Sequence, residues 1–187
     1  GIWKSSSGDF NSYTRLAGGS TLGVDSVDGW RGNAYGFTDV GGSNFYDTRR
    51  TLLALAPSNE NILYVLYENG LTNTTPTRNK EADLFKLNMT SGNVWTNLSA
   101  NLPDFPGGDL DATDPFTIQG GYDLFITVKP NDPNFVILGG TSLYRSTNGF
   151  STPTYNTTLS WIGGYGNTLP TLTFYPNSHP DIHNLVF

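Results

Sequence analysis

The sequence contains no cysteine, few charged residues and no long apolar run. The absence of cysteine among 187 residues excludes disulfides and cysteine-ligated metals, although it does not fix the cellular compartment. Charged residues make up 14%, about half the usual share in globular proteins, which argues against long solvent-facing helices. No apolar run approaches the length of a membrane span, so we expect no transmembrane segment.

Basic side chains are also scarce. Ten Lys and Arg stand against 16 Asp and Glu, which gives a net charge of -6. Binding to a nucleic-acid backbone needs clustered Lys and Arg, so we expect no nucleic-acid partner. The chain is instead rich in turn formers, with 22 Gly and 11 Pro, while 36% hydrophobic residues are enough for a core. This composition predicts an all-β protein made of short strands and frequent turns.

An internal repeat organises the chain. Residues 52–65 and 125–138 align without a gap when Pro130 is placed on Pro57. Each stretch is an apolar run, a turn that opens with Pro and closes with Asn, and a second apolar run. Proline ends the first strand because it cannot donate to a ladder, and Asn and Asp favour the turn. Each stretch is therefore predicted to be a β-hairpin.

A second repeated element follows each of these hairpins. Residues 143–150 echo residues 2–10, and residues 84–95 are a looser third copy. The shared form is an apolar, an aromatic and a basic residue, then a Ser, Thr or Asn-rich turn with Gly, then an aromatic. Glycine permits the positive φ that such a turn needs. This second hairpin completes a four-stranded unit.

The order of the two hairpin types predicts a β-propeller segment of about three four-stranded blades in an incomplete ring. Residues 1–16 would end one blade, 51–99 would form a second, 122–161 a third, and 182–187 would start a fourth. We expect the remaining blades to belong to a larger parent chain, since blades protect their edges by closing a ring. The alternative is a self-contained β-sandwich.

The second hairpin type carries a turn that resembles the Asp-box, Ser-x-Asp-x-Gly followed by an aromatic. The matching residues are Ser146, Asn148, Gly149 and Phe150, with Asn148 in place of the family's Asp; in the first copy they are Ser5, Ser7 and Gly8. This motif occurs in sialidases, sortilin-type receptors and xyloglucanase-type glycosidases. Residues 121–146, followed by 179–183, are similar to secreted bacterial surface proteins with sialidase-like (BNR) repeats. The resemblance implies an Asp-box propeller and a secreted or cell-surface location.

No catalytic residue can be carried over from these enzymes. None of the arginines has the setting of the sialidase arginine cluster, and Arg145 occupies the repeated basic position shared with Lys4 and Lys86. A glycosidase needs two carboxylates at a controlled separation, and the 13 Asp and three Glu single out no pair. We therefore expect a segment without catalytic activity. The alternatives are part of a sialidase-like or xyloglucanase-like glycoside hydrolase, or a structural subunit of a surface assembly.

Two polar motifs are candidate sites for Ca²⁺ or another divalent metal. His179, Asp181 and His183 alternate, so a strand would place all three on one face, where they could bind a metal or act as acid and base. The alternative is a hydrogen-bonding cluster that anchors the innermost strand of a blade. A second set of oxygen ligands for Ca²⁺ lies in an acidic stretch whose other interpretation is a solvated connector: Asp109, Asp111 and Asp114.

Long connectors between blades are the expected ligand-binding segments. Residues 17–50, 100–121 and 162–181 should gather at one face near the axis. Aromatic rings beside Asn, Asp and Arg can stack on sugar rings and hydrogen-bond their hydroxyls, although the same residues could simply pack the loops. We therefore predict a module that presents loops to glycan or protein partners. The candidate binding residues are Trp30, Arg31, Tyr35, Tyr46 and Tyr165.

Overall fold

The computed structural model describes residues 2–17, 50–71, 79–104, 115–153, 160–164 and 182–187. These residues confirm the all-β prediction, because they form ten strands, one short 3-10 turn and no α-helix. Within them, no helix is long and apolar enough to cross a membrane. The elements are β1 (Ile2–Ser5), β2 (Tyr13–Ala17), β3 (Thr51–Leu55), β4 (Ile62–Glu68), β5 (Ala82–Asn88), β6 (Val94–Asn97), η2 (Ser99–Asn101), β7 (Phe125–Val128), β8 (Val136–Gly139), β9 (Leu143–Ser146) and β10 (Trp161–Gly163).

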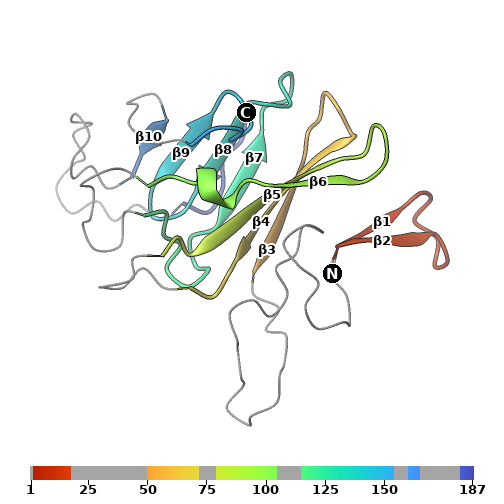
Figure 1. Ribbon diagram of the computed structural model, residues 1–187, viewed down its shortest axis with the longest axis horizontal. Helices are drawn as coiled ribbons and strands as arrows, with labels where there is room; N and C mark the ends of the chain where they lie inside the picture. Colours follow the sequence, from red (N-terminus) through yellow and green to blue (C-terminus); the bar gives the residue numbers. More distant parts are fainter. Residues whose placement is uncertain (1, 18–49, 72–78, 105–114, 154–159, 165–181) are drawn as a thin grey trace, which may run out of the picture.

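The strands form three antiparallel sheets (Figure 1). One is the hairpin β1–β2, and the other two are meanders of four consecutive strands, β3–β6 and β7–β10. The two repeated hairpins predicted from sequence are confirmed, with Leu53 opposite Val65 in β3–β4 and Ile126 opposite Leu138 in β7–β8. Within each four-stranded sheet, every strand pairs with the strand that follows it in the chain, as antiparallel strands joined by turns and loops do.

The turns of these two hairpins are the same in structure. In β3–β4, the Ala56 N–H donates to the Ile62 carbonyl at 2.9 Å, and an Asn59 side-chain oxygen accepts from the backbone two residues on. In β7–β8, the Lys129 N–H donates to the Phe135 carbonyl at 2.9 Å, and Asp132 takes the role of Asn59. The sequence repeat therefore extends to the backbone hydrogen bonds.

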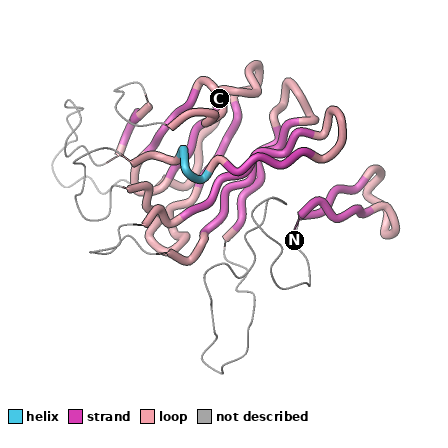
Figure 2. The backbone as a smooth tube through the Cα atoms, viewed as in Figure 1, coloured by secondary structure: helices cyan, strands magenta, loops and turns pink. Residues whose placement is uncertain are grey.

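The three sheets stack in chain order, with β3–β6 in the middle (Figure 2). A large apolar cluster joins its one face to β7–β10 and includes Tyr64, Leu66 and Leu138. A smaller cluster joins its other face to β1–β2 and includes Val65, Phe85 and Ile2. Strand β4 is consequently buried along its whole length, with apolar residues pointing to both faces. The middle sheet thus has a neighbouring sheet on each side. This explains why the sequence of β4 is a nearly continuous apolar run, as is typical of strands buried on both faces.

The two four-stranded sheets turn equivalent faces toward the sheet that precedes each of them in the chain. The aromatic position of the second repeated hairpin shows this, because Phe85 packs toward β1–β2 and Tyr144 packs toward β3–β6. The basic position that follows it points the opposite way, as strand alternation requires. Lys4 Nζ lies 3.7 Å from Met89 Sδ of the next sheet. Lys86 Nζ donates to Asn134 Oδ1 of the sheet after that at 3.3 Å.

Residues 182–187 differ from the sequence prediction, because they form no strand. A strand requires a ladder of backbone hydrogen bonds, and among the described residues none pairs with this segment. The segment instead lies against the far face of β7–β8. Ile182 covers Gly139, where a Cβ would stand 2.5 Å from Ile182 Cγ2, and the Phe187 ring lies 6.5 Å from that of Phe135.

A candidate binding surface at the polar end of the sheets

Buried polar side chains gather at one end of the two four-stranded sheets, which we call the polar end. It is the end where β3, β5 and β7 begin and where β4 and β8 finish, so the connectors between sheets enter and leave there. Buried polar groups need hydrogen-bond partners, and at this end they hold the connectors in place. The buried polar residues of the polar end are Glu68, Asn69, Asp83, Thr117, Asp123, Thr141 and Ser142.

Glu81 ties the end of one connector to both four-stranded sheets. Its Oε2 accepts from the Thr117 hydroxyl at 2.6 Å and from the Ile118 N–H at 2.7 Å. The carbonyl of Thr117 in turn accepts from the Thr141 N–H, just beyond β8, at 3.1 Å. A charged acceptor makes stronger hydrogen bonds than a neutral one. Thr117 and Ile118, which lie in the segment that leads into β7, are therefore held by both sheets.

Asn69 fixes the start of the loop between β4 and β5. Its amide nitrogen donates to the Lys80 carbonyl at 3.0 Å, and its side-chain oxygen accepts from the Leu71 N–H at 2.9 Å. Asn69 is 7% exposed. One buried amide thus closes the two arms of this loop.

Arg50, the residue just before β3, bonds to the segment that leads into β7. Its Nη1 donates to the Gly121 carbonyl at 2.9 Å and to the Tyr122 carbonyl at 2.7 Å. Glu68 lies close above Gly121, since a Cβ there would stand 2.5 Å from Glu68 Oε2. Gly121 also has a φ of +85°, which favours glycine. Only glycine fits this position without a shift of its neighbours.

Tyr122 is the exposed aromatic residue of the polar end, at 59% exposure. The His183 ring meets it edge-on, with centroids 4.9 Å apart. His183 Nε2 lies 3.8 Å from the buried Asp123 carboxylate. Together these side chains offer a ring face beside polar groups. The sequence interpretation did not select Tyr122 as a binding residue, although its place between a connector and a strand is a usable signal.

Most of the binding and metal-site residues proposed from sequence lie outside the described residues. His183 is described; it lies outside the strands and contacts Tyr122 and Asp123. In the part of the chain that the structure describes, no group of three or more His, Cys, Asp or Glu could hold a metal. The proposed residues outside it are Trp30, Arg31, Tyr35, Tyr46, Asp109, Asp111, Asp114, Tyr165, His179 and Asp181.

The Asp-box-like turn after β9 lies at the opposite end and anchors the sheet. Ser146 Oγ accepts from the Asn148 N–H at 3.3 Å and the Phe150 N–H at 2.8 Å, and donates to Asn148 Oδ1 at 2.8 Å. The Gly149 N–H donates to the Asn134 carbonyl at 2.7 Å, and the Phe150 side chain is fully buried between the sheets. The turn therefore locks the outer hairpin of its sheet to the inner one.

The first copy of this turn, between β1 and β2, has the same central serine. Ser5 Oγ accepts from the Ser7 N–H at 3.2 Å, and Gly8 has a φ of +85°. Its aromatic residue behaves differently, because Phe10 is 94% exposed. The serine-centred turn is thus a repeated local structure, whereas the aromatic anchor is used only where a core lies beneath it.

Comparison of the chain with known protein families, with curated proteins and with solved structures gave no match.

Proposed function

We propose that the chain is part of an Asp-box-type β-propeller at the cell exterior, without catalytic activity, whose polar end presents loops that bind glycans. The observation that carries this proposal is the middle sheet, because the sheets before and after it in the chain pack against its two opposite faces. A two-layer sandwich leaves one face of each sheet to solvent, whereas blades stacked around an axis cover both. The repeated orientation of the sheets supports blades.

Three features of the polar end support a binding role. Arg50, Glu81 and Asn69 hold the roots of the connectors by hydrogen bonds to the backbone. Loops held on such a scaffold are the usual carriers of binding residues. The exposed Tyr122 ring offers an apolar face with a polar hydroxyl, which suits stacking on a sugar.

The carboxylates of the polar end support binding rather than hydrolysis. Glu81 accepts two short hydrogen bonds that hold a connector, and Asp123 is fully buried. A glycosidase needs one carboxylic acid and one carboxylate that both reach the scissile bond. Glu81 holds the fold instead, and the enclosed Asp123 carboxylate is out of reach of a glycosidic bond.

A glycan array probed with the chain tests the proposal. We expect binding to a restricted set of glycans, and we expect Tyr122→Ala to weaken it about tenfold, which corresponds to ~1.4 kcal/mol. Tyr13→Ala is the matched control, because Tyr13 is 54% exposed on β2, far from the polar end. An array with no bound glycan, or equal losses in both variants, would contradict the proposal. Release of reducing sugar ends from a polysaccharide would overturn the non-catalytic part.

A further inference from the structure

The face of the middle sheet that looks toward β1–β2 is only partly covered. Register places Leu53, Val65 and Phe85 in one row across this face, with Leu55 in the adjacent row. Val65 and Phe85 are fully buried under the hairpin β1–β2, whereas Leu53 and Leu55 on the innermost strand are 53% and 48% exposed. Two leucines in adjacent rows of this otherwise buried face are therefore exposed to solvent.

In the sheet β7–β10, the positions equivalent to Leu53 and Leu55 are covered. The residue equivalent to Leu53 is Ile126, and the residue equivalent to Leu55 is Val128, at 7% and 4% exposure. Both belong to the cluster shared with β3–β6, and β3 packs against β7. An inner strand of the preceding sheet thus buries the equivalent row. No inner strand precedes β3 among the described residues.

Among the residues that the structure describes, the hairpin β1–β2 has no corresponding inner strands. Its strand β1 is equivalent to β5 and β9, which pair on both sides, with β4 and β6 and with β8 and β10. Among the described residues, β1 pairs only with β2. Neighbouring strands in a sheet lie about 4.8 Å apart. If two strands were added to the edge of β1, the outer one would lie two strand positions from β1, as β3 lies from β5. Such a strand would reach the exposed leucines.

We infer that the open edge of β1 together with Leu53 and Leu55 forms one slot, and that its occupant is a β-hairpin of the chain's own repeat type. The occupant has two short apolar strands joined by a turn from Pro to Asn, as in residues 52–65 and 125–138. One strand adds to β1 through backbone hydrogen bonds, and its partner packs apolar side chains on the two leucines. The inference depends on the stacked sheets of the proposed propeller, but not on glycan binding.

The probe is a synthetic peptide with the sequence of residues 51–68, titrated into the intact chain. Hydrogen exchange read by mass spectrometry should show at least tenfold slower exchange in β1 when the peptide is bound. The double variant Leu53→Asp with Leu55→Asp should weaken peptide binding at least tenfold, because it places two charges under an apolar strand. The control pair is Phe10→Asp with Val94→Asp, which alters two apolar residues that are 94% and 56% exposed and lie away from the slot. A peptide of the same composition in scrambled order should not bind.

The outcomes separate this inference from its rivals. Absence of peptide binding, or equal loss in the slot variant and the control pair, would overturn it. Light scattering that shows a dimer, lost in the slot variant and unaffected by the peptide, would assign the slot to a second copy of the chain and also overturn it. Matching thermal unfolding of both double variants shows that they are folded. The variant Tyr122→Ala should bind the peptide normally, so failure of glycan binding leaves this test intact.

Discussion

Tyr64 shows how one side chain links two sheets. Its hydroxyl donates to the Pro133 carbonyl of the next sheet at 3.1 Å, and its ring is fully buried. Burial, and to a lesser extent the negative charge of Asp132, raises the pKa of Tyr64 from 10.0 to about 12. The folded state therefore favours the protonated hydroxyl, and this contribution to stability is complete below the pKa of the unfolded chain.

We predict that Tyr64→Phe removes a pH-dependent part of the stability. In the parent chain this part is lost as the pH rises from 10 toward 12, because the unfolded state releases the proton first. Urea unfolding at stepped pH values should show the free energies of the parent and the variant converging over that range. At neutral pH the variant should be less stable by about 0.5–1.5 kcal/mol, through the lost hydrogen bond. Tyr13→Phe, at an exposed site, should follow the parent; parallel curves for Tyr64→Phe would refute the prediction.

At the scale of elements, two glycine turns give a matched comparison. Gly149 has a φ of +66°, and a Cβ there would strike the Tyr64 hydroxyl. Gly92, in the turn between β5 and β6, has a φ of +104° with no atom within 4 Å of a built Cβ. Both positions strain an L-residue, but only Gly149 adds a steric conflict with the neighbouring sheet.

We predict that Gly92→Ala costs about 1–2 kcal/mol from backbone strain alone. Gly149→Ala should cost more by about 1–3 kcal/mol, because Tyr64 or the turn must move to admit the methyl group. Urea unfolding of both variants measures the difference. Equal losses would mean that Tyr64 or the turn moves at no cost in free energy, and would contradict the tight contact between this turn and the neighbouring sheet.

Local patterns account for what the sequence predicted correctly among these elements. The hairpins 52–65 and 125–138 follow from apolar runs around a Pro turn, because both strands lie close in the chain. Residues 182–187 form no strand, because an apolar run by itself does not specify which strand it pairs with. The contacts of the polar end join distant residues, such as Arg50 with the carbonyl of Gly121, and no local pattern encodes them. Tyr122 was missed although its position between a connector and a predicted strand can be read in the sequence.

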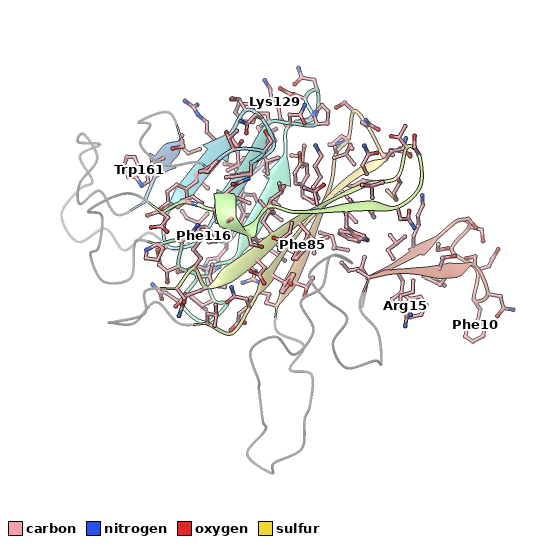
Figure 3. The ribbon with its side chains drawn as sticks, in the orientation of Figure 1. Phe10, Arg15, Phe85, Phe116, Lys129 and Trp161 are labelled. Atoms are coloured by element: carbon pink, nitrogen blue, oxygen red, sulfur yellow. The ribbon has the colours of Figure 1, made fainter. Side chains whose placement is uncertain are left out.

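At the scale of the whole molecule, the hairpin β1–β2 is the least secured layer. Besides the smaller apolar cluster, Trp95 Nε1 holds it by donating to the Leu16 carbonyl at 3.2 Å. The two four-stranded sheets share the larger cluster, which includes Phe116 (Figure 3). The hydrogen bonds of Arg50 and Glu81 also hold them together at the polar end. Stability in such a molecule is expected to differ between layers.

We predict that Trp95→Ala releases β1–β2 while the other two sheets stay folded. Hydrogen exchange should quicken in residues 2–17 and remain slow in β4 and β8. Leu66→Ala is the contrasting variant, because Leu66 is fully buried in the larger cluster, and it should lower the unfolding free energy of both four-stranded sheets by about 2–5 kcal/mol. Faster exchange throughout the chain in Trp95→Ala would show that the layers unfold as one.

The shared orientation of the sheets has a consequence for assembly. The aromatic positions Phe85 and Tyr144 pack toward the preceding sheet, and the basic positions Lys4 and Lys86 contact the following one, so the backward and forward sides of a layer differ. A contact between a forward and a backward surface is heterologous, and two equal ends cannot reproduce it across a twofold axis. Further layers that repeat this contact would therefore add head to tail. They form a closed ring only if the rotations between successive layers add up to a full turn.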